Sequence, residues 1–173
     1  MKVEFDYIAY WEILLNDSSR WFSGKQGFSV SNENILNALF IELAEKRNLE
    51  WVGDVYDQEL TLQEVVEILK NFDFSVFAKA IGTEEIIPSE LRINYKVRIK
   101  EAGMIWIIHK YDQYPFPSNP HAHNIDNNFK LHLGNGICYR RREEVYRIPK
   151  KNLLDIRKKI ENSINIQLPE LEV

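Results

Sequence analysis

The sequence predicts an α+β fold, in which an acidic, mainly helical first half packs with a C-terminal antiparallel β-sheet and a terminal helix. Apolar residues recur at three- and four-residue spacing in the first half, whereas in the second half they alternate with polar residues. The charge changes at the same place: residues 1–86 hold 7 basic and 16 acidic side chains, and residues 87–173 hold 15 and 10. We therefore expect an acidic helical lobe, 1–86, and a basic sheet lobe, 87–173, or one domain that combines them.

The first half has helical features in four segments and a loop-like composition in one. Helices are expected over 32–47, from Thr61 onward and over 75–80, and a loop is expected over 18–27. Over 3–15 the two periods are mixed, so a helix or a strand is expected there, with the helix favoured. The helix over 32–47 has the clearest pattern, because its apolar residues form one stripe behind a possible cap at Ser31 or Asn32. Thr61 and Glu64 match a capping box, in which each side chain accepts a hydrogen bond from the other residue's backbone amide.

The second half has the two-residue period of strands. Strands are expected over 91–100, 104–110, 129–133, 137–141 and 145–148, with a turn at Gly134-Asn135-Gly136, a long excursion over 111–128 and a final helix from Pro149. The alternation over 91–100 places apolar residues on one face of a strand and basic residues on the other. The tail after Ile164 is expected to be frayed.

Several classes of protein are excluded by composition. The longest apolar runs, such as 104–108, are far shorter than a membrane-spanning helix, and the first residues lack a signal-peptide pattern. Cys138 is the single cysteine, so the chain forms no internal disulfide and no multi-thiolate zinc site. We expect a soluble, cytoplasmic protein that has no membrane partner and no cofactor, with Cys138 as an ordinary strand residue.

All four histidines lie within one 24-residue stretch, at positions 109, 121, 123 and 132. This stretch also contains Asp112 and three prolines, which restrict the backbone of the loop. Imidazoles titrate close to neutral pH, so two of them can serve as base and acid in metal-free cleavage of an RNA phosphodiester. On this hypothesis the catalytic residues are His121, His123, His109 and Asp112.

A basic surface next to these histidines favours a nucleic-acid partner. Residues 87–160 hold 15 basic and 7 acidic side chains, and Tyr111, Tyr114 and Phe116 are placed to stack on bases. The residues expected to bind the nucleic-acid backbone are Arg140, Arg141, Arg142, Arg147, Lys150 and Lys151.

Two other interpretations of the same residues stay open. His121 and His123 form a His-x-His motif that, with Asp112, His109 or His132, has the ligand types of a metal site. Alternatively, the histidines fasten the loop to the sheet by hydrogen bonds to carbonyl groups. In that case the arginines at 140–142 form surface ion pairs with the glutamates at 143–144, and such pairs contribute little to stability.

Residues 91–160 resemble the TumE-type toxins of bacterial and archaeal toxin–antitoxin systems. The features that carry the resemblance are Trp106, the stretch 112–117, the sequence Pro120-His121-Ala122-His123 and the helix from Lys150. The resemblance implies a growth-inhibiting toxin, a nuclease in one reading, that a partner neutralises. It does not extend to the acidic helical half.

A second class of function therefore remains open. The protein is then a non-enzymatic interaction protein, such as an antitoxin, an immunity protein or a phage-defence component. Its acidic half would bind a basic protein partner or imitate the charge of a nucleic acid.

Overall fold

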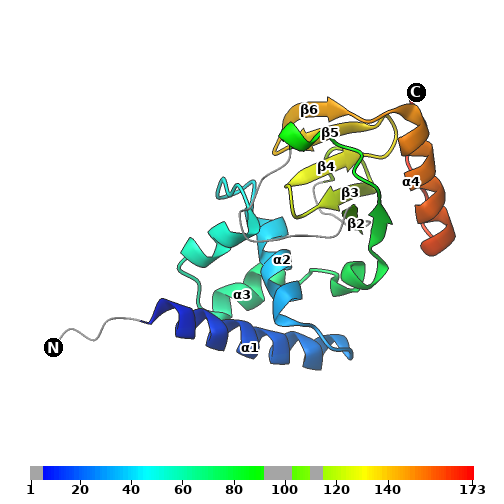
Figure 1. The fold of residues 1–173 in the computed structure, drawn as a ribbon. Coiled ribbons are helices and arrows are strands. Elements are labelled where there is room, and N and C mark those ends of the chain that lie inside the picture. Colours follow the sequence, from blue (N-terminus) through cyan, green and yellow to red (C-terminus); the bar gives the residue numbers. More distant parts are fainter. Residues whose placement is uncertain (1–5, 92–102, 110–114) are drawn as a thin grey trace. The chain divides into compact units, whose positions relative to one another are not determined.

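The computed structural model describes residues 6–91, 103–109 and 115–173 (Figure 1). Its helices and six-stranded antiparallel sheet, with a terminal helix, confirm the predicted α+β class. The chain divides into two units, Met1–Phe74 and Ser75–Val173. This division precedes the one expected after residue 86, because β1 (Ile81–Thr83) pairs with β2 (Met104–His109) and so belongs to the sheet.

The first unit is built from helices. They are α1 (Tyr7–Gln26), α2 (Asn32–Leu43), the 3-10 helix η1 (Val52–Asp57) and α3 (Leu62–Leu69), and a further 3-10 helix, η2 (Phe74–Lys79), begins at its last residue. Large apolar side chains such as Trp11, Phe22 and Phe40 are buried. No helix in the described part of the chain is both long and apolar enough to cross a membrane.

Helix α1 extends through the segment 18–27, so the loop expected there is wrong. Gly27, with φ of 76°, ends the helix in the left-handed conformation that suits glycine. Two serines of this segment make side-chain hydrogen bonds with Val30, which follows the end of the helix. Ser19 Oγ donates to the carbonyl of Val30 at 2.5 Å, and the amide of Val30 donates to Ser23 Oγ at 2.8 Å.

Two expected helix starts are confirmed. The hydroxyl of Ser31 accepts from the amide of Asn34 at 3.1 Å, and α2 then runs to Leu43 rather than to residue 47. In the capping box of α3, the amide of Thr61 donates to Glu64 Oε2 at 2.8 Å, and the amide of Glu64 donates to Thr61 Oγ1 at 3.3 Å. These hydrogen bonds from Thr61 hold the pKa of Glu64 below its ordinary value.

The second unit contains a sheet in which each strand pairs with the next along the chain. Its other strands are β3 (His121–Asn124), β4 (Phe129–His132), β5 (Ile137–Arg140) and β6 (Glu143–Arg147). The strands expected at 104, 129, 137 and 145 are confirmed, whereas β3 lies in the expected excursion. The strand predicted over 91–100 lies outside the described residues, except for Leu91, which closes the 3-10 helix η3 (Ser89–Leu91).

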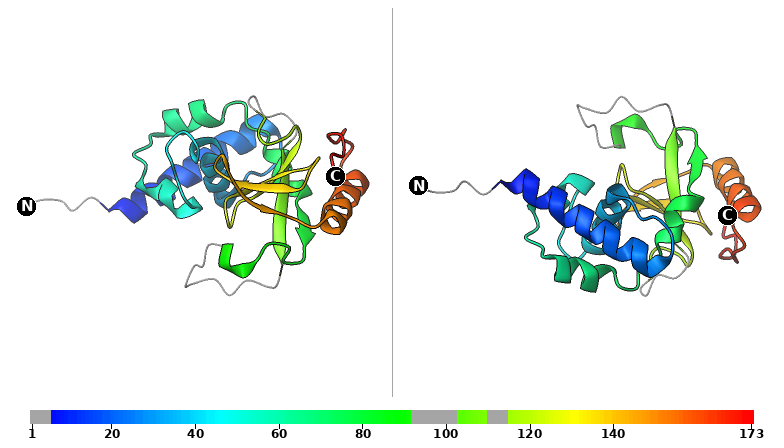
Figure 2. Two further views of the ribbon diagram at one scale, coloured as in Figure 1. Left: turned by 90° about the horizontal axis from the view of Figure 1, so that it is seen from above. Right: turned by 90° about the horizontal axis from the view of Figure 1, so that it is seen from below.

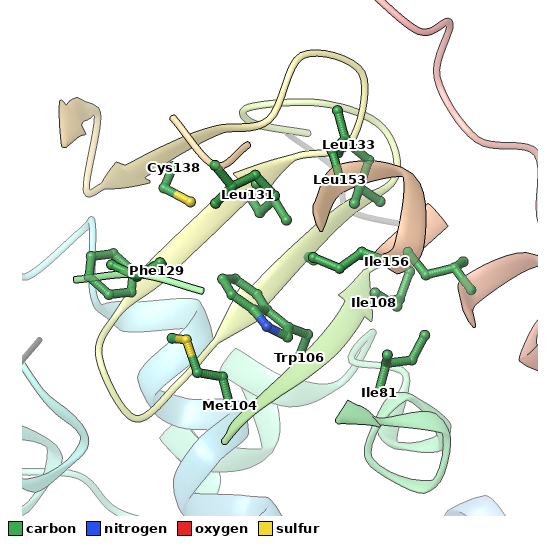
Figure 3. Close-up of a cluster of buried hydrophobic side chains, with 14 of the residues drawn as sticks. Ile81, Met104, Trp106, Ile108, Phe129, Leu131, Leu133, Cys138, Leu153 and Ile156 are labelled. Carbon is green, nitrogen blue, oxygen red and sulfur yellow. The ribbon is translucent and has the colours of Figure 1, made fainter. Parts of the chain in front are cut away.

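One face of the sheet packs against α4 (Lys150–Ser163), which lies beside the strands in all views (Figures 1 and 2). Trp106 and Ile108 from β2 and Leu131 from β4 point into the same cluster as Leu153 and Ile156 of α4 (Figure 3). All five are almost completely buried. Because side chains alternate along a strand, the intervening residues must lie on the opposite face of the sheet.

The C-terminal tail is held in place, so the expectation of a frayed end is wrong. The amide of Glu172 donates to the carbonyl of Gly134 at 2.8 Å. Arg157 Nη1 donates to the carbonyls of Leu133 at 2.6 Å and Pro169 at 2.8 Å. The tail therefore links the β4–β5 turn to α4.

Cys138 is a strand residue, as expected, and its side chain is fully buried in the core. Burial raises the pKa of its thiol to about 12. The thiol is thus held in the protonated form, which is neither a good nucleophile nor a metal ligand.

Candidate functional site

The sheet places all four histidines on the face opposite α4. Strand pairing aligns His109 of β2 with His121 of β3, and His121 with His132 of β4. His123 occupies the adjacent row, where it pairs with Ile107 on one side and Lys130 on the other. We call this set the histidine face: His109, His121, His123, Lys130 and His132.

The three histidines nearest to β3 form a buried cluster. His109 stacks on His121, with ring centroids 5.4 Å apart and an interplanar angle of 9°. The ring of His123 lies 6.0 Å from that of His109 and is tilted by 54°. Exposure is only 8% for His109 and 1% each for His121 and His123. Three of the four predicted catalytic residues are therefore brought together. His109 lies in the strand expected over 104–110, whereas His121 and His123 lie in a strand rather than in the expected excursion.

Backbone hydrogen bonds define the neutral tautomers of His121 and His132. His121 Nδ1 lies 3.2 Å from the carbonyl oxygen of Ser118, so Nδ1 carries the proton and Nε2 has the lone pair. His132 Nδ1 instead accepts from the amides of Gly134 at 3.0 Å and Asn135 at 3.2 Å, so its Nε2 carries the proton. In this directly paired set, His121 thus offers an acceptor at its Nε2 and His132 offers a donor at its Nε2.

The pKa values of His121, His123 and His132 all lie below the ordinary value of an imidazole. Burial, together with the charges of His109 and Lys130, lowers the pKa of His121 to about 3. Burial, followed by the charge of Lys130, places the pKa of His123 well below 6.5. Burial also lowers the pKa of His132, although the carboxylate of Glu172 opposes this shift. His121 and His123 are therefore neutral at physiological pH.

His123 is the least satisfied of these side chains. Within the described part of the chain, neither of its ring nitrogens makes a hydrogen bond of normal geometry. The side chain of Asn128, which is itself buried, is near enough to oppose the fall in the pKa of His123. An imidazole in such surroundings is costly, because buried polar atoms lose their hydrogen bonds to water.

The fourth predicted catalytic residue, Asp112, lies outside the described residues, as do Tyr111 and Tyr114. Among residues 6–91, 103–109 and 115–173, no group of three or more His, Cys, Asp or Glu side chains has an arrangement that fits a metal ion. The near-parallel stacking of His109 on His121 explains why this pair does not converge on one point, because metal-ligating nitrogens must aim their lone pairs at the metal.

The loop before β3 adds an aromatic ring and a cation beside the histidine face. Phe116 packs edge-on against Tyr139 at 4.9 Å, and the guanidinium of Arg142 lies 4.7 Å from the Phe116 ring centroid. Tyr139 pairs with Lys130, so it lies on the same face of the sheet. The loop, whose Phe116–Pro117 and Asn119–Pro120 peptide bonds are cis, is tied down by Ser118, whose hydroxyl accepts from the amide of Leu133 at 3.1 Å.

The predicted nucleic-acid-binding residues separate into two groups. Arg140 is bound within the fold: its guanidinium donates to the carbonyls of Asn127 and Leu91 and lies 4.6 Å from the Phe129 ring centroid. Arg141 has φ of 57° in the β5–β6 turn and is half-buried. Four side chains are exposed: Arg142, Arg147, Lys150 and Lys151. Of these, Lys150 Nζ donates to the carbonyl of Val173 at 3.1 Å.

His132 is the histidine of this face that was left out of the predicted catalytic set, as was Lys130. A signal for it exists in the sequence: in a strand over 129–133, Phe129, Leu131 and Leu133 share one face, so Lys130 and His132 share the other. The pairing of His132 with His121 required the position of β3, which the alternation pattern does not reveal.

This chain matches no protein-family model, and neither a curated protein nor a solved structure is significantly similar to it.

Proposed function

We propose that this protein acts on RNA through the histidine face, as a toxin-like, nucleic-acid-directed ribonuclease of the cytoplasm. One observation carries the proposal: His121 and His132 are paired across β3 and β4, and their tautomers provide an acceptor and a donor at Nε2. An acceptor and a donor side by side are the two groups that phosphodiester cleavage requires.

The proposed reaction uses the ribose of the substrate as nucleophile. His121 Nε2 takes the proton of the 2′-hydroxyl, and the resulting oxygen attacks the adjacent phosphorus. The bond from phosphorus to the 5′-oxygen breaks, and the imidazolium of His132 supplies its Nε2 proton to that leaving oxygen. In the imidazolium Nδ1 is protonated as well, so His132 gives up the hydrogen bonds that Nδ1 accepts from the two backbone amides. The products are a 2′,3′-cyclic phosphate and a 5′-hydroxyl. Lys130, which pairs with His123 in the next row, would neutralise charge on the phosphate.

Burial and proton affinity both limit this reaction. His121 is 1% exposed, so an RNA reaches its Nε2 only when the chain that covers it moves aside. His121 is neutral and so is in the correct form for a base, but a group with a pKa of about 3 is a weak one. A bound phosphate raises the proton affinity of a neighbouring imidazole, because the anion stabilises the imidazolium. His132 must be protonated to act as acid, and its pKa is lowered. Because the pKa of His132 lies below the ordinary value of about 6.5, we expect the rate already to fall as the pH rises toward 6.5.

Asparagine substitutions test the two histidines with little disturbance of their backbone contacts. Asparagine can retain the hydrogen bond made at Nδ1, as donor to Ser118 or as acceptor from Gly134, while Nε2 is lost. With labelled single-stranded RNA, we expect His121→Asn and His132→Asn each to slow cleavage by about 100-fold or more. Lys79→Gln, at an exposed position of η2 outside the predicted nucleic-acid-binding set, serves as a control for general charge effects.

The outcomes separate the alternatives. Cleavage that survives a chelator and is lost in both asparagine variants, with melting temperatures near that of the wild type, supports the proposal. Loss of cleavage on chelation would indicate instead that the histidines bind a metal ion. Absence of cleavage by the wild type over pH 5–8, or equal cleavage by all variants, overturns it. Growth arrest on expression of the wild type but not of His132→Asn would support the toxin-like role.

A second candidate is the non-enzymatic interaction protein, and the charge of the first unit favours it. Met1–Phe74 carries 14 acidic and 6 basic side chains, whereas Ser75–Val173 carries 12 and 16. A net charge of −8 on the first unit and +4 on the second is a property of surfaces rather than of the fold, and it selects partners of opposite sign.

A further inference from the structure

The first unit contains a groove between the start of α1, the start of α2 and η1. It has a volume of about 440 Å³, and its lining includes Tyr7, Ile8, Trp11, Glu12, Leu15 and Tyr56. Hydrogen bonds fix its walls, because the hydroxyl of Tyr7 donates to the carbonyl of Tyr56 and that of Tyr10 donates to the carbonyl of Leu60. The groove is therefore a formed feature of one unit.

Large apolar side chains stand exposed around this groove. Ile8 is 82% exposed, and Tyr7 and Tyr56 are each 38% exposed. Trp11 forms a buried part of the lining and contacts Tyr56 edge-on, with ring centroids 5.3 Å apart. Contiguous exposed apolar surface on a monomer is a usual mark of an interaction site.

Carboxylates accompany the apolar surface. Glu12 lines the groove, and Glu33 and Asp57 directly follow the lining residues Asn32 and Tyr56 in the sequence. All three are exposed, and within residues 6–91 none of them forms an ion pair with Lys or Arg. Among the described residues that line the groove, none is basic. The electrostatic field here thus attracts cations and repels the backbone of a nucleic acid.

We propose that this groove binds a basic segment of a partner protein, which inserts a large apolar side chain against Ile8 and Trp11 and places lysines or arginines beside Glu12. The chemistry follows from the two properties of the site: an apolar floor for one anchor residue, and unpaired carboxylates around it. A nucleic acid does not fit these requirements, and neither does an acidic partner. This inference is independent of the ribonuclease proposal, since it concerns the other unit.

The probe for this site is a fluorescent 18-residue peptide of leucine and lysine, with leucine at helical i, i+3, i+4, i+7 spacing. Its binding to the full-length protein is measured by anisotropy. We expect Ile8→Ser to weaken binding about tenfold, because most of the side chain's apolar surface becomes unavailable to the partner. Ile13→Ser is the matched control: Ile13 is 61% exposed on the same helix but does not line the groove, so its replacement should change the affinity less than twofold.

Charge is tested separately. Glu12→Lys is expected to weaken peptide binding and to reduce its dependence on salt, whereas Glu161→Lys, exposed on α4, should leave both unchanged. A peptide with glutamate in place of lysine should not bind. RNA cleavage by Ile8→Ser should equal that of the wild type, which keeps a failure of the groove distinct from a failure of the histidine face.

Three results would overturn the proposal. The first is equal weakening by Ile8→Ser and Ile13→Ser, which would show unspecific adhesion to α1. The second is binding of the glutamate peptide as tightly as the lysine peptide. The third is self-association of the wild type that Ile8→Ser abolishes in sedimentation experiments, which would identify a second copy of this chain as the occupant.

Discussion

His123 is the side chain whose surroundings suit its chemistry least. It is 1% exposed, it lies beside Lys130 across the strand pair, and its ring nitrogens lack hydrogen bonds of normal geometry within the described part of the chain. An unsatisfied buried polar group costs about 1–3 kcal/mol relative to an apolar group of the same shape. Such a residue either serves a function or is tolerated at a cost to stability.

The substitution His123→Leu distinguishes these cases. At pH 7.5 we expect an unchanged or higher free energy of unfolding, because leucine removes the unsatisfied nitrogens and keeps much of the volume. Between pH 6 and pH 4 the fall in stability should become shallower by up to about 1.4 kcal/mol per pH unit, since one buried imidazole no longer titrates. Urea denaturation at several pH values measures both quantities.

His132→Asn provides the comparison, because His132 is only half-buried and its removal should change the pH dependence less. A loss of more than about 2 kcal/mol at pH 7.5 in His123→Leu would contradict this expectation. It would indicate that the ring makes an essential hydrogen bond, with Asn128 the nearest described candidate.

At the scale of elements, one arginine joins three parts of the second unit. Arg157 of α4 reaches the carbonyl of Leu133 after β4 and that of Pro169 in the tail, at 2.6 and 2.8 Å. Hydrogen bonds from a charged donor to partly buried carbonyls are among the stronger ones in proteins. This residue therefore accounts for much of the order of the tail.

Arg157→Met should lower the free energy of unfolding of the second unit by about 1.5–3 kcal/mol. The apolar stem is retained, so the loss reports mainly the two hydrogen bonds. Lys158→Met, which changes an exposed neighbour, should lie within about 0.5 kcal/mol of the wild type. Hydrogen exchange supplies a second readout: the amide of Glu172, bonded to Gly134, should exchange faster only in Arg157→Met. Equal exchange in both variants would count against the role of Arg157.

Sequence patterns predicted the elements whose signals are local. The stripe of α2, the capping box of α3 and the alternation in β4 each depend on residues a few positions apart, and all three are confirmed. The serines of α1 misled because they favour loops in general, whereas Ser19 and Ser23 bond to Val30, seven or more residues away.

The candidate site required contacts that no local pattern contains. Strand β3 consists of only four residues, His-Ala-His-Asn, with one apolar side chain, so its periodicity is too short to be recognised. Its partners fix the position of the histidines, and those partners come from residues 104–109 and 129–132. The crowding of histidines in sequence was visible; their burial and complementary tautomers were not.

At the scale of the whole molecule, the side chains that ordinarily titrate near neutral pH, the histidines, are confined to one unit. All four histidines belong to Ser75–Val173. His121 in the unfolded chain binds a proton near pH 6.5, whereas in the folded unit it does so only near pH 3. The stabilising effect is therefore complete above pH 6.5 and is lost as the pH falls from 6.5 toward 3.

We expect the two units to respond differently to mild acid. Between pH 7 and pH 5 the thermal transition of the second unit should shift down by several degrees, while that of the first unit, which has no histidine, should change little. Hydrogen exchange read out by mass spectrometry follows both units in one experiment. A single transition that moves as a whole would contradict this expectation.

Because Cys138 is buried, the reactivity of its thiol reports the opening of the second unit. A fully buried thiol with a pKa of about 12 reacts with an aromatic disulfide reagent only when the sheet core is exposed. The rate of labelling of this single cysteine therefore measures how often the second unit opens, with no engineered probe and no signal from the first unit. Cysteines introduced elsewhere for spectroscopic labels can likewise be modified selectively in the native protein, while Cys138 stays unmodified.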